Sequence, residues 1–173
     1  MTILALVAVA CGSSAEPTDT VPPAPTSTPR PSATPAPGEL TAEERAYFAT
    51  VAGIVDGYGA AWESLGVLFE DVDIYDLEWL EDVGRMLGVI EGLNEDVWAI
   101  RGPRSCSGIH RHLLNAADYQ KQFVELLSQA IIDADASGVR DAMAKGHSST
   151  MELDKMMGAI DEFRQERGVS VEK

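Results

Sequence analysis

The prolines of this 173-residue chain are concentrated in one short segment. Eight of the nine prolines fall between Gly12 and Leu40, and Pro103 is the only one beyond them. Proline lacks a backbone N–H and its ring clashes with the preceding turn, so it interrupts helices and central strands. The chain after residue 40 is therefore free to form long helices, whereas the chain before it is not.

The proline-rich segment is otherwise filled largely by Ser and Thr and has almost no large apolar side chains. A segment of this composition cannot bury enough apolar surface to offset the entropy lost on ordering. We therefore expect residues 11–40 to form a disordered linker with local polyproline II structure.

An apolar run precedes the linker. Residues 3–10 read ILALVAVA and lead directly into Cys11. As a helix this run would span about 12 Å, which is too short for a bilayer core of about 30 Å. Such a run is typical of the apolar region of a secretory signal peptide. No Lys or Arg precedes it, so we expect residues 1–10 to be a signal peptide truncated at its start.

The tetrapeptide Ala8-Val9-Ala10-Cys11 resembles the lipobox of bacterial lipoproteins, with Ala at position 8 where Leu is commonest. The resemblance implies that Cys11 is acylated and that the peptide before it is removed. It also implies a lipid-anchored protein on the extracytoplasmic face of a bacterial membrane, because two or more acyl chains give stable attachment. A lipid on Cys11 would leave Cys106 without an intramolecular cysteine partner. We expect Cys106 to be a buried thiol, with a free reactive thiol as the alternative.

After the linker, apolar residues recur at spacings of three and four in four successive segments, and each pattern indicates one face of a helix. The first segment begins at a capping box at Thr41 and runs to about residue 70. The apolar positions of the other three run from residue 77 to 100, from 109 to 134 and from 139 to 163, the segments themselves being somewhat longer, and basic residues and Gly168 end the last one. Segments of about 28 to 31 residues with connections of about three to five residues predict an all-α, up-down-up-down four-helix bundle. We place this bundle at residues 41–168, followed by a flexible tail at 169–173.

Glycines in the first two segments leave alternatives open. Each interior glycine costs about 1 kcal/mol relative to Ala, so a broken first segment and a three-helix arrangement are the main alternative. The glycines concerned are Gly53, Gly57, Gly59 and Gly66. In the second segment, a stripe at four-residue spacing predicts the close approach of a neighbouring helix, with a ligand groove as the alternative. That stripe consists of Gly84, Gly88 and Gly92.

The chain is strongly acidic, with 28 acidic and 13 basic residues and a formal net charge of -15. This balance excludes nucleic-acid binding, which requires clustered Lys and Arg. The acidic residues are densest between positions 70 and 82. A divalent-cation site is one hypothesis, but Asp71 and Asp73 are not followed by the glycine of an EF-hand loop. We interpret residues 70–82 as a solvated corner that can engage a basic protein or an envelope partner.

Patterns for metal and haem sites are largely missing from the sequence. There is no Glu-x-x-His pair for a di-iron centre and no Cys-x-x-Cys-His motif for covalent haem. Met143, His147 and Met151 lie four residues apart and are candidate ligands for Cu(I). Because Met commonly fills bundle cores, we favour a core role for Met143 with the other two flanking it. We commit to no metal and no cofactor. Cys106 and His110 also lie four apart, but antiparallel helices would keep them away from the Met143 group.

Catalysis is not indicated. Several serines lie near histidines in the sequence, but no nucleophile elbow or glycine loop positions one of them. We therefore predict a membrane-anchored extracytoplasmic lipoprotein with a non-catalytic helical binding or interaction domain. A copper or haem carrier is the alternative, and an enzyme is the third choice.

Overall fold

A computed structural model describes residues 38–169, and within that range every regular element is helical. The chain divides into two units, residues 1–33 and 34–173, and all described residues lie in the second. The elements are α1 (Ala42–Leu68), α2 (Leu77–Ala99), the short 3-10 helix η1 (Arg104–Cys106), α3 (Ser107–Ile132) and α4 (Ala136–Arg167). The predicted all-α, four-helix fold is confirmed. The expected signal peptide, Cys11 and nearly all of the linker and tail lie outside the described residues.

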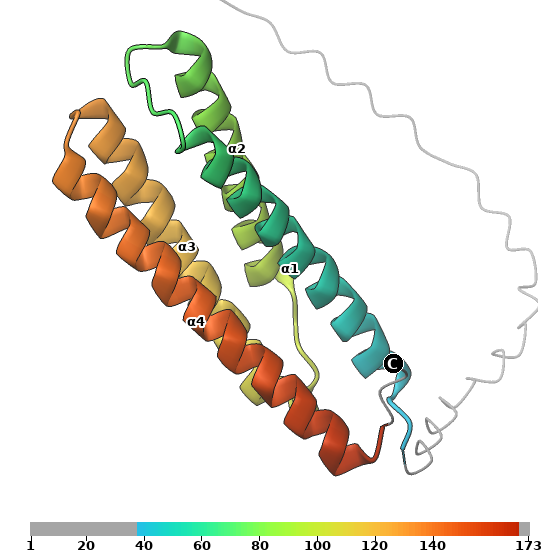
Figure 1. The fold of residues 1–173 in the computed structure, drawn as a ribbon. Coiled ribbons are helices and arrows are strands. Elements are labelled where there is room, and N and C mark those ends of the chain that lie inside the picture. The colour runs from blue at the N-terminus through green and yellow to red at the C-terminus, as the bar shows by residue number, and fades with distance from the viewer. Residues whose placement is uncertain (1–37, 170–173) are drawn as a thin grey trace, which may run out of the picture. The chain divides into compact units, whose positions relative to one another are not determined.

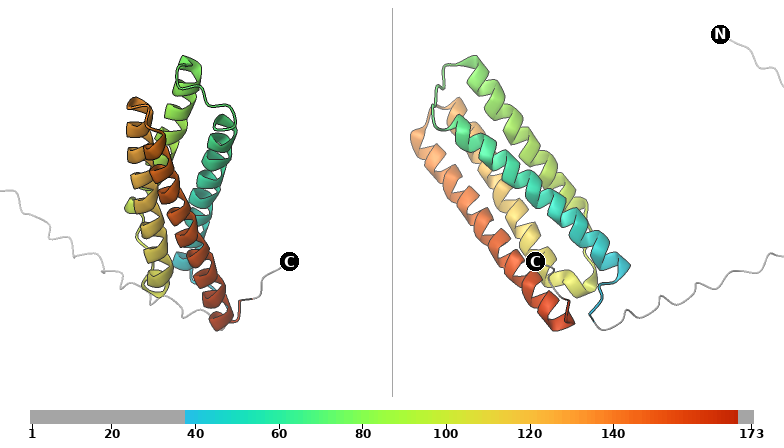
Figure 2. Two further views of the ribbon diagram at one scale, coloured as in Figure 1. Left: turned by 60° about the vertical axis from the view of Figure 1, so that its left-hand side comes forward. Right: turned by 45° about the vertical axis from the view of Figure 1, so that its right-hand side comes forward.

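The four α-helices run alternately up and down and form two hairpins, α1–α2 and α3–α4 (Figures 1 and 2). The α3–α4 pair is packed most extensively, and small side chains such as Ala116 and Ser149 lie between the two helices. Ser149 on α4 is buried there, and its hydroxyl donates to the carbonyl of Ala116 on α3 at 3.0 Å. None of the described helices has an apolar stretch long enough to span a bilayer.

The helix ends follow the local signals in the sequence. At α1, the Glu44 N–H donates to Thr41 Oγ1 at 3.0 Å and the Thr41 N–H donates to Glu44 Oε2 at 2.8 Å, which completes the predicted capping box. Asp135 caps α4 through the N–H of Ser137. Gly168 ends α4 in the left-handed conformation, with φ 69°, and the absence of a Cβ makes this conformation inexpensive.

The expected uniform lengths are wrong. The α-helices have 23 to 32 residues, and only the α3–α4 connection, residues 133–135, is as short as predicted. Residues 69–76 connect α1 to α2. Within this connection Asp73 accepts a hydrogen bond from the Tyr75 N–H, and Asp76 at its end caps α2. The α2–α3 connection contains η1.

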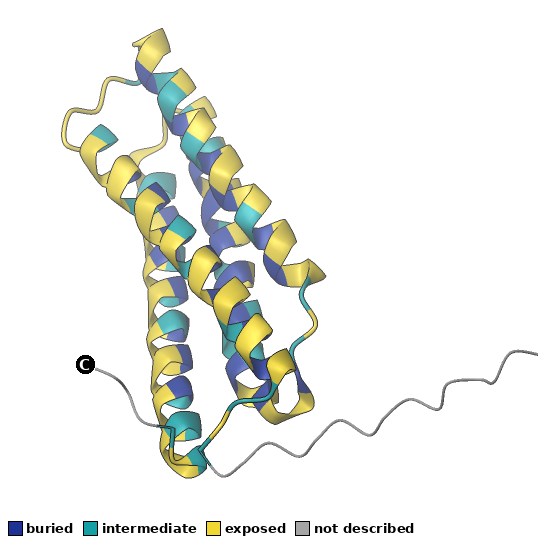
Figure 3. Ribbon diagram, turned by 90° about the vertical axis from the view of Figure 1, so that its right-hand side faces the viewer, coloured by how far each residue is buried: buried dark blue, intermediate teal, exposed yellow. Residues whose placement is uncertain are grey.

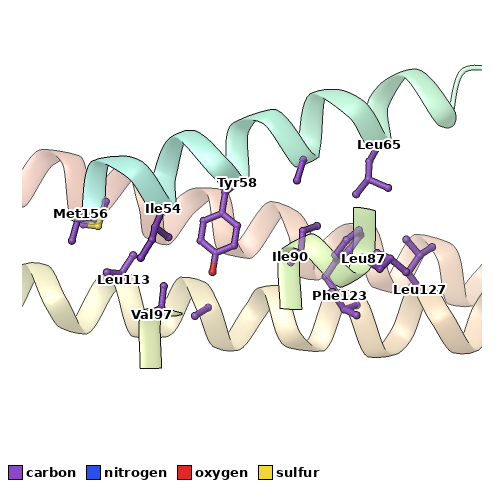
Figure 4. Close-up of a cluster of buried hydrophobic side chains, with 14 of the residues drawn as sticks. Ile54, Tyr58, Leu65, Leu87, Ile90, Val97, Leu113, Phe123, Leu127 and Met156 are labelled. Carbon is purple, nitrogen blue, oxygen red and sulfur yellow. The ribbon is translucent and has the colours of Figure 1, made fainter. Parts of the chain in front are cut away.

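Apolar side chains from all four α-helices fill the interior, while the outward faces are exposed (Figures 3 and 4). The core also holds a buried hydrogen bond in which the Tyr58 hydroxyl donates to Asn94 Oδ1 at 2.6 Å. Near it, the rings of Trp62 and Phe123 lie 4.5 Å apart between centroids. Large aromatic side chains thus fill the space between the two hairpins.

The glycine predictions are corrected by the structure. Helix α1 is continuous through all of its glycines, so the three-helix alternative is wrong. A Cβ added at Gly84, Gly88 or Gly92 would meet no described atom within 4 Å, so this stripe lies open and not against a neighbouring helix. The tight approaches lie elsewhere, at Gly57 against Leu93 and at Gly146 against Trp62.

Candidate functional site

An apolar cavity of about 270 Å³ lies at one end of the helical unit, between the α1–α2 connection and the α3–α4 turn. We call this cavity the tip groove. It is lined by Phe69, Val72, Ile74, Trp79, Ala130, Ile131, Ala134, Asp135, Ala136 and Val139. In Figure 1 the two connections lie at the same end, opposite the start of α1 and the end of α4.

Two local features hold the walls of the tip groove. On one side, the Trp79 indole N–H donates to the Leu68 carbonyl at 2.8 Å and the ring packs edge-on against Phe69 at 5.9 Å. On the other side, the α3–α4 turn is tight because Gly138 approaches Ala130, where a Cβ would be only 2.9 Å away from the Ala130 Cβ. The walls of the groove are therefore fixed by the Trp79 hydrogen bond on one side and by the tight α3–α4 turn on the other.

Large apolar side chains around the tip groove are unusually exposed. Five of the eleven exposed large hydrophobic side chains of the described residues lie on or beside the two connections. They are Val67, Val72, Tyr75, Leu77 and Ile132, with exposures between 50% and 89%. Apolar surface gathered at one place on a monomer is typical of an interaction site.

Acidic residues surround this apolar surface and form what we call the acidic rim. Residues 69–82 and 130–139 together hold nine acidic side chains and no Lys or Arg. The rim consists of Glu70, Asp71, Asp73, Asp76, Glu78, Glu81, Asp82, Asp133 and Asp135. Eight of these nine side chains are exposed, and Asp82 is partly buried. No three Asp, Glu, His or Cys side chains in residues 38–169 are arranged to hold a metal ion.

Five rim carboxylates already have partners in the fold. Asp73, Asp76 and Asp135 accept backbone N–H bonds, Asp82 pairs with Arg85 at 2.8 Å, and Asp133 accepts from Gln129 at 2.7 Å. The other four, which we call the open carboxylates, have no side-chain hydrogen bond or ion pair within residues 38–169. They are Glu70, Asp71, Glu78 and Glu81. Their charges are therefore available to a ligand.

The candidate copper residues lie away from the tip groove lining and on the outer face of α4. Met143 is 44% exposed and Met151 is 49% exposed, and His147 between them is exposed too. The expected core position of Met143 is therefore wrong. The buried face of α4 at this level is made of Ala142, Gly146 and Ser149, and Trp62 of α1 lies too close to Gly146 for a larger side chain there.

Cys106 and His110 lie at the start of α3, beside the end of α4 and away from the Met143 group, as the antiparallel arrangement predicted. Ser105 and Ile109 border a shallow depression with Phe163 near the end of α4. Cys106 between them is fully buried, so the expectation of a buried thiol is confirmed. Burial raises the pKa of the Cys106 thiol, which disfavours the reactive thiolate.

The same end of the unit contains a buried carboxylate that was not predicted as more than a cap. Glu44 is 2% exposed, and its Oε1 accepts from the Ser105 hydroxyl at 2.7 Å and from Arg167 at 2.9 Å. Burial acts to raise the pKa of Glu44, but the Thr41 and Ser105 hydrogen bonds and the Arg167 charge hold it below its ordinary value. Glu44 thereby connects the start of α1, through Thr41, with η1 and the end of α4.

A second buried carboxylate, between α3 and α4, was not predicted from the sequence. Glu152 is 8% exposed, and its Oε2 accepts from His112 Nδ1 at 2.8 Å and from Asn115 at 3.2 Å. Its Oε1 accepts from Lys155 at 2.6 Å. All of these partners lie on α3 and α4, so we assign the group to helix pairing. The pairing joins residues forty positions apart, which no local pattern indicates.

Replacing Glu152 with Gln is expected to make stability less dependent on pH. Hydrogen bonds from His112, Lys155 and Asn115 lower the pKa of Glu152 to about 2, against an ordinary value near 4.3. The carboxylate therefore stabilises the fold above about pH 4.3, and this contribution is lost as the pH falls towards 2. We expect Glu152→Gln to cost about 1–2 kcal/mol at pH 7, because the partly exposed Lys155 is screened.

Urea unfolding of the wild type and the variant between pH 7 and pH 2.5 measures this difference. The gap between the two free energies of unfolding should narrow steadily below about pH 4.3. Asp154→Asn is the control, since Asp154 is exposed and lies two residues away on the same helix. A gap that stays constant over the whole range would show that the charge of Glu152 is not what stabilises the fold.

No family model, curated protein or solved structure matches the chain.

Proposed function

We propose that this protein is a lipid-anchored, extracytoplasmic interaction protein whose helical unit binds another macromolecule at the tip groove. The observation that carries the proposal is the combination of an apolar cavity, exposed apolar side chains and an acidic rim at one end of the unit. The lipobox-like sequence at Cys11 supports the anchored location.

The position of the groove fits an anchored protein. Gly38, where the described chain begins, lies against the end of α4, since a Cβ on Gly38 would be 3.4 Å from the Gly168 carbonyl oxygen. Helix α1 then runs 27 residues away from this end, or about 40 Å at ~1.5 Å per residue. A chain tethered through residues 11–37 would therefore present the groove at the end far from its attachment.

The lining of the groove favours binding over chemistry. It contains no His, Cys, Lys or Ser, and its one charged side chain, Asp135, caps α4. General acid–base or nucleophilic catalysis needs such groups within reach of the substrate. The groove also lacks the His, Met and Cys side chains that a copper or haem carrier uses.

We expect Cys11→Ala to abolish lipid attachment, whereas Cys106→Ala should leave it intact. A lipoprotein carries its acyl chains on the one cysteine of the lipobox, and Cys106 is fully buried in the helical unit. Cells expressing each variant are labelled with radioactive palmitate and then extracted with a phase-separating detergent. The wild type and Cys106→Ala should carry label and enter the detergent phase.

Equal labelling and partitioning of the two cysteine variants would contradict the lipid anchor. Protease added to intact cells or spheroplasts tests the side of the membrane. The helical unit should be degraded without lysis if it is extracytoplasmic, and protection from the protease would contradict that location.

A further inference from the structure

We propose that the ligand of the tip groove is a basic polypeptide segment that carries a large apolar side chain between Lys or Arg residues. The inference rests on the proposed function in one respect, namely that the tip groove is a binding surface. It adds the chemical class of the partner, which the lining, the surroundings and the charge of the groove together define.

The size of the cavity indicates one inserted side chain and not a whole small molecule. Pockets for drug-sized ligands are typically about 300–1,000 Å³ and enclose most of the ligand. The tip groove, at about 270 Å³, falls below this range. Interfaces between proteins commonly centre on one large apolar side chain inserted into such a pocket. The near absence of polar groups in the lining means that this side chain is aliphatic or aromatic.

The exposed apolar side chains extend the contact beyond the cavity. Val72 is part of the lining and is 50% exposed, while Tyr75 and Leu77 on the same connection are 89% and 71% exposed. Ile132 lies on the opposite side of the groove and is 76% exposed. A ligand that covers both connections must be longer than its anchoring side chain, which a polypeptide is.

The charge of the rim selects a cationic partner. The rim has nine acidic side chains and no basic one, and four of these carboxylates have no partner in the fold. Glu70 and Asp71 lie on the α1–α2 connection, whereas Glu78 and Glu81 lie on the first turns of α2. Several cations held at separate positions are needed to match them, and a segment with Lys or Arg on both sides of its apolar residue supplies these cations.

The same features disfavour phosphate-bearing polymers and neutral polysaccharides as partners. A phosphate-bearing polymer would be repelled by the rim, and a neutral polysaccharide has no large apolar group for the cavity. Inorganic polyphosphate and a neutral glycan are therefore included as probes, and saturable binding of either one at the tip groove would overturn the proposal.

The experiment measures peptide binding to residues 34–173, the unit that contains every described core residue. The probe is a fluorescent twelve-residue peptide with Trp and two Leu at helical spacing and Lys at the remaining positions. Matched peptides replace Trp and Leu by Ala, or Lys by Glu. We expect the first peptide to bind at least tenfold more tightly than either matched peptide, and its affinity to fall as salt is raised.

Two variants with matched controls test whether the peptide binds at the tip groove. The rim variant neutralises the open carboxylates by Glu70→Gln, Asp71→Asn, Glu78→Gln and Glu81→Gln. Its control makes the same change in net charge on exposed residues of α4, by Asp141→Asn, Asp154→Asn, Asp161→Asn and Glu166→Gln. The cavity variant is Ala136→Phe, since Ala136 is exposed and lines the groove, and its control is Ala144→Phe on the same helix.

The rim and cavity variants should each weaken binding at least tenfold, and each control less than threefold. Circular dichroism is used to check that the two variants and their two controls remain helical. Equal losses in the rim variant and its control would show binding to overall charge only, and would overturn the proposal. Equal affinity for the Lys peptide in which Ala replaces Trp and Leu would also overturn the proposal, as would the absence of saturable binding of the first peptide. None of these results depends on Cys11, so the lipid anchor and the ligand class fail or stand separately.

Discussion

Gly146→Ala is expected to lower the free energy of unfolding by about 2–3 kcal/mol, although the substitution places a better helix former inside α4. A Cβ at this position would lie 2.8 Å from Trp62 Cζ2 and closer still to Cη2. The indole cannot easily give way, because its other neighbour is Phe123, with 4.5 Å between the ring centroids. The cost of overpacking therefore exceeds the gain in helix propensity.

Gly158→Ala is the matched control on the same helix and should have the opposite sign. No described atom lies within 4 Å of a Cβ at Gly158. This variant should therefore gain about 0.5–1 kcal/mol from helix propensity alone. Urea unfolding measures both changes, and a double variant of Gly146→Ala with Trp62→Phe should recover part of the loss because the smaller ring leaves room. If both glycine variants are stabilised, the close approach of Trp62 to α4 is wrong.

The parts of the fold that sequence reasoning predicted depend on residues that are near one another in the chain. The capping box at Thr41, the cap at Asp135 and the end of α4 at Gly168 each involve partners within about one turn. The two hairpins follow because a connection of eight residues or fewer, as at 69–76 and 133–135, brings the next helix back antiparallel to the one before it. The second segment was predicted to begin at residue 77, where α2 does begin, but the connection before it, residues 69–76, is longer than the predicted three to five residues.

Spacing shows which residues share a helix face but not which face turns inward. On α4, we predicted a core position for Met143 because Met commonly fills bundle cores, yet Met143 is exposed. The buried side there has Ala142 and Gly146, and Trp62 of α1 excludes a larger residue at Gly146. The prediction that a neighbouring helix approaches the Gly84 stripe on α2 was also wrong. Small residues occur on open helix faces as well as on packed ones, and this stripe lies on an open face.

The candidate site was predicted only in part. Its acidic residues are visible between positions 70 and 82 of the sequence, and we expected them to be a solvated corner. The cavity is not visible, because Trp79 and Val139 meet across it from segments about sixty residues apart along the chain. Separations of 123 and 40 residues likewise hide the Glu44–Arg167 and Glu152–His112 pairs from sequence reasoning. Charge is a local property of a sequence, whereas a cavity is a property of how its helices pack.

Gln120→Met is expected to raise the free energy of unfolding by about 1–3 kcal/mol, even though it removes a polar group from the middle of α3. Gln120 is fully buried, and neither its Nε2 nor its Oε1 has a hydrogen-bond partner among the described residues. The indole N–H of Trp62 is likewise buried without a partner. A buried amide without partners has lost its hydration and gained nothing in return, and Met fills a similar volume without that cost.

Asn94→Leu tests the same reasoning with the opposite expectation. Asn94 is also a buried amide, at 1% exposure, but its Oδ1 accepts from the Tyr58 hydroxyl at 2.6 Å. Removing this acceptor leaves the Tyr58 hydroxyl buried and unpaired, so the variant should lose about 1–3 kcal/mol. Urea unfolding at pH 7 gives both values, and an unchanged m value shows that the change lies in stability. If both variants are destabilised, Gln120 is hydrogen bonded in solution, and the core between the two hairpins is more polar than its packing indicates.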